Sequence, residues 1–208
     1  MPVRRALVAL VTATATAVVA TAATLGATVA PAQAEVETVR DSARDAETRL
    51  LIGEVPARVA AGADIRALRA EHGGGRLSFA VRVADLYRGA TRTVVDAEIM
   101  LPNEREYVAR LEVAEGTRTV TLLDARRFEP VPCDGLTGRV AGADDRYLLS
   151  FPRACVFNPR EVRYGAKVTV TEVGPEGSEV AEIADDARLD GRVDELGAAK
   201  GADPLVNN

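Results

Sequence analysis

The sequence of 208 residues predicts an all-β protein, an antiparallel β-sandwich of jelly-roll or immunoglobulin-like size with one disulfide. Three observations support this prediction. Short stretches of alternating apolar and polar residues follow one another at intervals of roughly 8–12 residues, and turn residues separate them. No convincing helix pattern interrupts these stretches. The two cysteines, Cys133 and Cys155, both lie near prolines and other turn residues.

Residues 1–34 have the features of a secretory signal peptide. Two arginines provide a basic start, residues 6–34 contain no charged side chain, and the segment ends in Ala32-Gln33-Ala34. This order of features is typical of cleavage after a small-residue site. The alternative is a retained membrane anchor, because the uncharged stretch is long enough to span a bilayer. Its low hydrophobicity per residue and the helix-breaking Pro31 favour cleavage after Ala34.

Cleavage would leave 174 residues (208 − 34) and change the formal charge from −5 to −7, because residues 1–34 hold two arginines and no acid. This length suits one domain. The negative balance excludes nucleic acid as a partner, since phosphate binding needs a basic face. Two cysteines in an oxidising compartment most often pair, which predicts a Cys133–Cys155 disulfide. Two separate buried thiols are the alternative.

Residues 35–63 form a lead-in segment that we expect to pack on the main domain. Apolar residues recur in it at steps of three and four, which suits one face of a helix. The stretch is also highly charged, and Leu50, Leu51 and Ile52 fit a short strand equally well. Pro56 then marks a loop. The sequence leaves helix and strand open for this segment.

Residues 64–184 form the predicted β-sandwich domain. Its alternation is clear at Leu77, Phe79 and Val81, which are separated by polar or small residues, as a strand buried on one face requires. A turn from His72 through three glycines joins this strand to the preceding one. The predicted strands cover residues 65–71, 77–83, 91–101, 107–113, 117–123, 128–131, 136–140, 147–151 and 162–173, with an edge strand at 180–183.

The stretch from residue 185 to residue 208 has no alternating pattern. It reads DDARLDGRVDELGAAKGADPLVNN and is rich in small and acidic residues. Such a composition buries too little apolar surface to offset the entropy of ordering the chain. We therefore predict that residues 185–208 form an acidic, largely disordered C-terminal tail, with disorder concentrated in residues 198–208.

The cysteine-containing half resembles a family of secreted proteins. The residues that carry this resemblance are Cys133-x-Gly135-Leu136, Phe151-Pro152-Arg153-x-Cys155, Asn158-Pro159-x-x-Val162-Arg163, Asp185-Asp186-Ala187-Arg188 and Asp190-Gly191. They are similar to motifs of single-domain β-sandwich proteins of high-GC Gram-positive bacteria, which carry a signal peptide and whose function is not characterised. The resemblance implies a fold and a location and brings no activity with it.

A second resemblance lies near the start of the mature chain. Asp41-x-x-x-Asp45, followed by Asp64-Ile65 at the start of a strand, is similar to sandwich modules of the carbohydrate-binding and DOMON type. Those modules usually have a glycine before the second Asp, and Arg44 stands at that position in this chain.

The sequence predicts no catalytic residues. His72 is the only histidine, and its glycine neighbours place it at an exposed turn, away from any nucleophile motif. With both cysteines paired, no thiol nucleophile and no zinc set remain. The 31 acidic residues offer many carboxylate pairs for glycoside hydrolysis, yet no spacing singles out one pair.

Acidic residues offer the alternative of a metal site. Asp41, Asp45 and Asp64 could converge on an extracellular calcium ion, because carboxylate oxygens are its preferred ligands. Further acidic candidates are Asp144, Asp145, Asp185, Asp186 and Asp190. The simpler interpretation is that all of these are solvated acids in turns. We therefore predict no metal, no cofactor and no metal requirement for folding.

Aromatic residues offer little surface for sugar binding. The chain has no Trp, and six of its eight Phe and Tyr residues fall on predicted core faces: Phe79, Tyr107, Phe128, Tyr147, Phe151 and Tyr164. Tyr87 and Phe157, both near turns, are expected to be free to meet a ligand.

The sequence therefore predicts a secreted, non-catalytic binding or structural domain, located outside the cell or at the cell wall. We expect a monomer with an unknown extracellular or cell-wall partner, no nucleic acid, and no membrane contact after signal cleavage. The alternative is a carbohydrate-binding module or an extracellular hydrolase of unrecognised type. A cleft with convergent carboxylates would favour the enzyme, and an exposed apolar or aromatic patch would favour binding.

Overall fold

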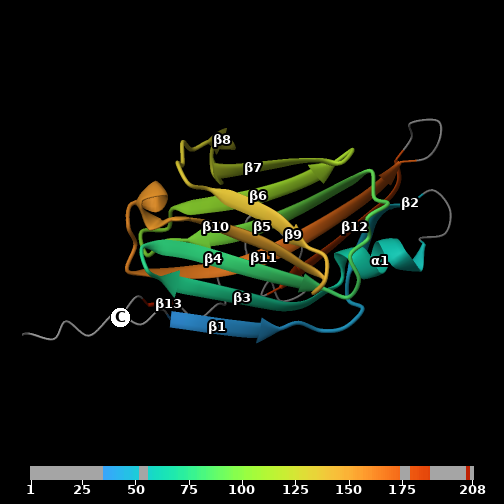
Figure 1. The fold of residues 1–208 in the computed structure, drawn as a ribbon, viewed down its shortest axis with the longest axis horizontal. Coiled ribbons are helices and arrows are strands. Elements are labelled where there is room, and N and C mark those ends of the chain that lie inside the picture. The colour runs from blue at the N-terminus through green and yellow to red at the C-terminus, as the bar shows by residue number, and fades with distance from the viewer. Residues whose placement is uncertain (1–34, 52–55, 174–178, 188–204, 207–208) are drawn as a thin grey trace, which may run out of the picture. The chain divides into compact units, whose positions relative to one another are not determined.

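The computed structural model describes residues 35–51, 56–173, 179–187 and 205–206. These residues form two antiparallel sheets packed together, which confirms the predicted β-sandwich (Figure 1). Within the described ranges, no helix combines the length and apolar character that crossing a membrane requires. The predicted signal peptide, residues 1–34, lies outside the described residues.

The smaller sheet has five strands in the order β1-β3-β4-β10-β9. Its strands are β1 (Glu35–Arg40), β3 (Ile65–Gly73), β4 (Arg76–Val83), β9 (Thr137–Ala141) and β10 (Arg146–Pro152). The larger sheet has the order β2-β12-β11-β5-β6-β7-β8, and β13 pairs with one end of β11. Its strands are β2 (Glu47–Leu51), β5 (Arg92–Met100), β6 (Glu106–Ala114), β7 (Thr117–Asp124), β8 (Glu129–Pro130), β11 (Glu161–Val173), β12 (Glu179–Ala187) and β13 (Leu205–Val206).

The core lies between the sheets and follows the predicted alternation. In β4, the side chains of Leu77, Phe79 and Val81 are buried, and the residues between them face outward. The Phe79 ring lies 6.2 Å from the Tyr164 ring of the larger sheet and 6.4 Å from the Phe151 ring of its own sheet. Burial of each such apolar side chain stabilises the fold by about 1.5–3 kcal/mol. The apolar positions of the alternating pattern are therefore the positions that face the core.

Residues 35–63 contribute one strand to each sheet. β1 pairs with β3 in the smaller sheet, and β2 pairs with β12 in the larger one. The strand interpretation is confirmed for Leu50 and Leu51, which belong to β2, whereas β1 was not predicted. The helical spacing of the apolar residues from Val36 to Leu50 was misleading. The segment is part of both sheets because strand pairing satisfies its backbone groups, although its apolar residues do not alternate along one face of a strand.

A short helix, α1 (Ala57–Ala63), lies between β2 and β3 in the chain. The sequence indicated only a loop there, because seven residues are too few to show a helical period. Val59 and Ala63 are buried in the core, and a Cβ at Gly62 would lie 2.8 Å from Cβ of Tyr87. α1 therefore packs closely on the loop that follows β4.

The last long strand, β12, runs beyond its predicted end. It was expected to be an edge strand ending at residue 183, but it lies between β11 and β2 and continues to Ala187. Asp185, Asp186 and Ala187 are therefore buried strand residues and do not belong to a disordered tail. Leu205–Val206 also form a strand, which pairs with Glu161 and Val162 of β11. Residues 188–204 and 207–208 lie outside the described residues.

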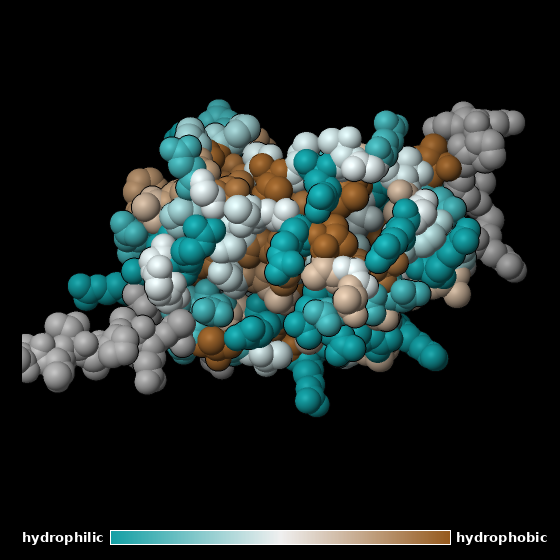
Figure 2. All heavy atoms as spheres, in the orientation of Figure 1, coloured by the Kyte–Doolittle hydropathy of each residue, from teal (hydrophilic) through white to brown (hydrophobic). Residues whose placement is uncertain are grey.

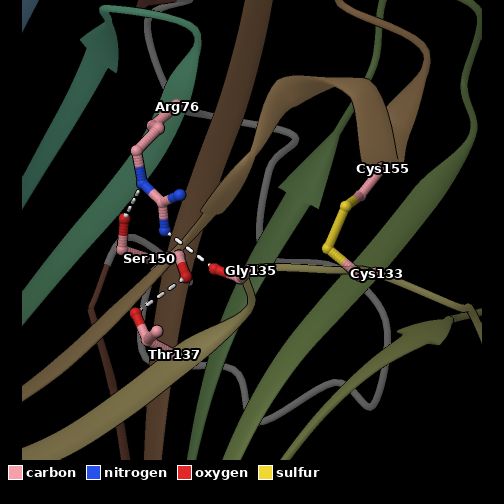
Figure 3. The surroundings of a disulfide bond; sticks show 6 residues. All are labelled: Arg76, Cys133, Gly135, Thr137, Ser150 and Cys155. Carbon is pink, nitrogen blue, oxygen red and sulfur yellow. Dashed lines mark hydrogen bonds between the residues drawn. A yellow bond between two sulfur atoms is a disulfide. The ribbon is translucent and has the colours of Figure 1, made fainter.

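The predicted disulfide joins Cys133 and Cys155, whose Cα atoms are 5.3 Å apart. Cys133 precedes β9, and Cys155 lies in the 3₁₀ helix η1 (Arg153–Val156) that follows β10. Figure 3 shows how Arg76 of β4 supports this region: its guanidinium donates to Ser150 Oγ and to the carbonyl of Gly135, both at 3.0 Å. The Cys133–Cys155 disulfide therefore closes one end of the β9–β10 hairpin.

Candidate functional site

An acidic cluster lies where the β1–β2 loop meets the end of β12. One carboxylate oxygen from each of Asp41, Asp45 and Asp185 lies within 4.8 Å of the other two. Asp41 and Asp45 belong to the loop, and Asp185 is two residues from the end of β12. The sequence identified Asp41 and Asp45 as candidates, and the fold adds a third carboxylate from a position 140 residues later in the chain.

Asp185 is held rigidly in this cluster. Its side chain is buried, with the residue only 5% exposed. Oδ2 accepts a hydrogen bond from the backbone N–H of Ile65 at 2.7 Å, and Oδ1 accepts one from the N–H of Asp186 at 2.8 Å. Because a carboxylate offers about four acceptor positions, both oxygens keep a free lone pair for a further ligand.

Asp64, the third predicted calcium ligand, has a different part in this region. Its Oδ1 accepts the backbone N–H of Arg44 at 3.2 Å, and its Oδ2 accepts Arg66 Nη2 at 2.7 Å. Asp64 therefore anchors the β1–β2 loop to the start of β3. Arg44 has a φ of 68°, the left-handed region that glycine adopts most readily.

Asp186, which follows Asp185 in β12, is a further buried carboxylate. The residue is 7% exposed, and neither of its carboxylate oxygens has a hydrogen-bond partner among the described residues. Asp41 Oδ2 is likewise buried without a partner. A buried polar atom that makes no hydrogen bond costs about 1–3 kcal/mol, and more when it carries charge. Native structures rarely tolerate several such atoms at one place.

Burial and mutual repulsion change the titration of these groups. Burial raises the pKa of Asp185 to about 7, and the charges of Asp41 and Asp45 add to this effect against the hydrogen bond from Ile65. Burial and then the charge of Asp41 raise the pKa of Asp186 to about 6. Burial, Asp45 and Asp64 raise the pKa of Asp41 to about 6.

The solvated-turn interpretation of the acidic residues is therefore wrong for Asp64, Asp185 and Asp186, which are all buried. The two residues Asp144 and Asp145 do lie in a turn, between β9 and β10, where Asp145 Oδ1 accepts the N–H of Leu86. Asp190 lies outside the described residues. The burial of Asp185 and Asp186 could not be predicted from the sequence, because acidic residues at the end of a buried strand look the same in composition as acidic residues in a disordered tail.

A cleft of about 490 Å³ is a second candidate site. Its walls come from the β4–β5 loop, the β6–β7 turn and the β9–β10 hairpin. Its apolar and aromatic lining includes Leu86, Tyr87, Val113, Val140 and Tyr147, and its charged lining consists of Arg88, Glu115 and Arg118. Figure 2 shows hydrophobic atoms gathered around β9 and β7 between hydrophilic side chains, on the side of the sandwich to which this cleft belongs.

The two tyrosines of the cleft are fixed in place. Tyr87 donates a hydrogen bond to Glu172 Oε1 at 3.3 Å, and the Arg58 guanidinium lies 5.1 Å from its ring centroid. Burial raises the pKa of Tyr147 to about 12, and a hydrogen bond with Thr93 opposes this shift. Tyr87 was predicted to be free to meet a ligand, and the structure places it in a cleft wall.

The other predicted aromatic positions have mixed outcomes. Phe157 is 68% exposed, as predicted, and the Arg105 guanidinium lies 5.0 Å from its ring. Phe128 was assigned to the core but is 64% exposed. It lies in the turn before β8 with a φ of 56°, which directs its side chain outward. The remaining five aromatic residues predicted for the core are buried: Phe79, Tyr107, Tyr147, Phe151 and Tyr164.

His72 was predicted at an exposed turn and is in fact fully buried in β3. The strand runs two residues beyond its predicted end at residue 71, to Gly73, so only Gly74 and Gly75 form the turn. His72 Nε2 lies 3.2 Å from the carbonyl oxygen of Pro159 and 3.3 Å from Arg153 Nη1. The imidazole therefore links β3 to the η1 region and lies away from both candidate sites.

No protein-family model matches this chain, and no curated protein matches it. The resemblance to secreted sandwich proteins therefore remains a prediction. The two candidate sites rest on the geometry of the described residues.

Proposed function

We propose that this chain is a secreted, non-catalytic β-sandwich domain that binds an extracellular or cell-wall ligand as a monomer. The observation that carries the proposal is the cleft lined by Tyr87 and Tyr147. Its volume of about 490 Å³ falls in the range usual for small-ligand sites, which are mostly apolar with a few charged groups. Held aromatic rings also lower the entropy cost of binding, because they are ordered before the ligand arrives.

The lining indicates the chemistry of the ligand. Two arginines, Arg88 and Arg118, are exposed at the cleft, and Glu115 is the single acid in its lining. Tyrosine rings and apolar side chains pack against a flat or ring-shaped group, whereas arginine recognises carboxylate and phosphate. An acidic sugar unit of a cell-wall polymer combines both features. We therefore infer an anionic glycan as the ligand.

The same geometry argues against hydrolysis in this cleft. A glycosidase needs two carboxyl groups on either side of the scissile bond, and among the described residues the lining supplies only Glu115. His72 cannot serve as a base at this place, because it is buried between β3 and Pro159. Binding without turnover is the function that this lining supports.

Secretion is supported by the signal-peptide features of residues 1–34 and by the disulfide. Disulfides persist in oxidising compartments outside the cytosol. The predicted cleavage site follows Ala34. N-terminal sequencing of the secreted protein should therefore start at Glu35. A mature chain that retains residues 6–30 would make this a membrane-anchored protein.

Calorimetric titration with acidic and neutral oligosaccharides, including soluble cell-wall fragments, tests the binding proposal. Acidic fragments should bind, and binding should weaken as salt rises. Changing Arg88→Gln together with Arg118→Gln should lower affinity by roughly tenfold or more, since charge-assisted hydrogen bonds each contribute about 1.5–3 kcal/mol. The control Arg160→Gln changes an exposed arginine outside the cleft.

Three outcomes would change the assignment. Equal binding by the double arginine variant would show that the cleft is not the site. Equal affinity for neutral and acidic fragments would favour the carbohydrate-binding-module alternative. Release of shortened sugars during the titration would favour the hydrolase. Light scattering of the secreted protein tests whether it is a monomer in solution.

A further inference from the structure

The acidic cluster joins two parts of the sandwich that belong to different sheets. Asp41 follows directly on β1 of the smaller sheet, Asp185 lies on β12 of the larger sheet, and Asp45 lies in the loop that leads to β2. Their oxygens converge within 4.8 Å. Three negative charges at this distance repel one another unless protons or a cation neutralise them.

The protein supplies little positive charge to the cluster. Besides burial and backbone hydrogen bonds, the strongest influences on Asp41 and Asp185 come from other aspartates. Arg66, the basic residue nearest in the chain to Asp64, forms its ion pair with Asp64 at 2.7 Å. The cluster therefore brings several carboxylate oxygens together. The side chains with the strongest charge effect on them are also acidic, so they do not neutralise the negative charge.

A second observation, independent of the cluster geometry, comes from Asp186. This residue is more than nine-tenths buried, and both of its carboxylate oxygens lack a hydrogen-bond partner among the described residues. Asp41 exerts the strongest charge effect on it, followed by Lys167, Glu47 and Asp45, so its carboxylate lies near that of Asp41. A buried carboxylate with two unsatisfied oxygens needs a ligand, because desolvation without a partner is costly.

We propose that Asp41, Asp45 and Asp185 bind one calcium ion, with Asp186 as a fourth carboxylate beside it. The donors are all oxygens, which suit hard cations, whereas zinc and copper sites use His or Cys. Calcium takes about six to eight oxygens in flexible geometry, so loop carbonyls and water complete the coordination. Magnesium demands a nearly ideal octahedron and keeps most of its water, which fits a carboxylate set drawn from a loop and a strand less well.

The ion acts as a cross-link between the sheets. It ties the β1–β2 loop to β12 at the point where Asp185 also accepts the N–H of Ile65. Binding only to the folded state stabilises that state by mass action. The site goes beyond the glycan-binding proposal and does not depend on it.

Calcium binding is measured on the secreted protein after EDTA treatment and dialysis, by calorimetric titration with CaCl₂ alone. Thermal unfolding is followed in parallel. We expect one ion per chain and a rise in Tm of about 5–10 °C at roughly a hundredfold excess over Kd. Asp45→Asn should weaken calcium affinity by roughly tenfold or more, since ligand charge sets affinity at such sites.

The exposed loop position of Asp45 makes this variant suitable, because its side chain is not part of the core. Its Tm in EDTA should equal or exceed that of the wild type, since one repulsive charge is removed, while the rise in Tm at the same calcium concentration should be clearly smaller. The matched control Asp144→Asn removes the same charge from the exposed β9–β10 turn and should bind calcium normally.

Three results would overturn the proposal. Absence of both binding heat and a Tm shift at millimolar calcium would show that no site exists. Normal calcium binding by Asp45→Asn would place the ion elsewhere. An equal Tm shift with the same concentration of MgCl₂ would remove the assignment to calcium.

Discussion

The carboxylate of Asp185 accepts a hydrogen bond of 2.7 Å from the backbone N–H of Ile65, 120 positions earlier in the chain. Ile65 is the first residue of β3 in the smaller sheet, and Asp185 lies near the end of β12 in the larger one. A buried acid therefore connects the two sheets at the acidic cluster. This connection makes the stability of the sandwich sensitive to the charge of that cluster.

Stability of the metal-free protein should fall as pH rises from 5 to 8. The folded protein holds the proton of Asp185 up to a pKa of about 7, whereas an unfolded chain releases it near 3.8. The folded state therefore binds more protons in this window, and deprotonation at higher pH favours unfolding. Asp41 and Asp186, each with a pKa raised to about 6, act in the same direction. So does Glu98, whose pKa burial raises to about 8.

Calorimetry in EDTA at several pH values between 5 and 8 measures this effect as a falling Tm. The neighbouring charges that act on Asp41 and Asp186 are those of Asp45, Glu47 and Asp64, which raise their pKa values, and that of Lys167, which lowers the pKa of Asp186. Asp186→Asn should reduce the slope of Tm against pH, because it removes one of the groups with a raised pKa. The change should have little other effect, since the Asp186 carboxylate makes no hydrogen bond among the described residues. A metal-free protein that is as stable at pH 8 as at pH 5 would contradict the prediction.

Replacing both cysteines, Cys133→Ser with Cys155→Ser, should leave the fold intact and lower its stability. The bond spans 22 positions, and closing a loop of this length constrains the unfolded chain by roughly 3 kcal/mol. For a domain of this size, the loss lowers Tm by several degrees to about 10 °C. Far-UV circular dichroism should keep its β signature. Reducing agent should destabilise the wild type by the same amount and leave the double variant unchanged.

The variant His72→Ala should unfold at lower urea concentration without affecting ligand binding in the cleft. His72 is fully buried and its Nε2 meets Pro159 O and Arg153 Nη1, so the change removes these contacts and leaves a cavity in place of the ring. A lost hydrogen bond of this kind costs about 0.5–1.5 kcal/mol, and the cavity adds to that loss. His72→Gln, which keeps a polar group, should lose less. Wild-type stability of His72→Ala would show that the imidazole contributes no structural link.

A methyl group at Gly138 should separate the two sheet edges. A Cβ there would lie 2.8 Å from Cγ2 of Val120, so Gly138→Ala overpacks the contact between β9 and β7 and costs roughly 1–3 kcal/mol. Combining it with Val120→Ala makes room for the methyl group. The double variant should therefore lose less stability than the sum of the single variants in urea unfolding. Additive losses would mean that Val120 does not limit the space.

Strand alternation was readable for the central sandwich because burial on one face imposes a period of two. The stretches around Phe79, Ile99 and Leu111 are therefore β4, β5 and β6, close to their predicted bounds. The same reasoning failed for β1, whose Val36 is 45% exposed and whose inward residues include two glutamates. Backbone pairing with β3 defines that strand, and backbone pairing leaves no apolar pattern.

The candidate sites were predictable only in part. Asp41 and Asp45 were identified because an acidic spacing in one loop is visible in the sequence, and Tyr87 because it lies near a turn. Asp185 and Asp186 were named as further acidic candidates but were assigned to a disordered tail, since their acidic, Ala-rich surroundings are typical of a tail. His72 was misplaced because three adjacent glycines obscured the last two residues of β3.

The sequence by itself determined the all-β class and the pairing partner of each cysteine, because side-chain alternation is local and two cysteines allow only one pair. Only the tertiary structure decided that Asp185 joins Asp41 and Asp45, and that Tyr87 and Tyr147 form one cleft. These groups come from strands and loops whose order in space differs from their order in the chain. Sheet order depends on long-range packing, and a local pattern of residues carries no information about which distant strand will lie beside it.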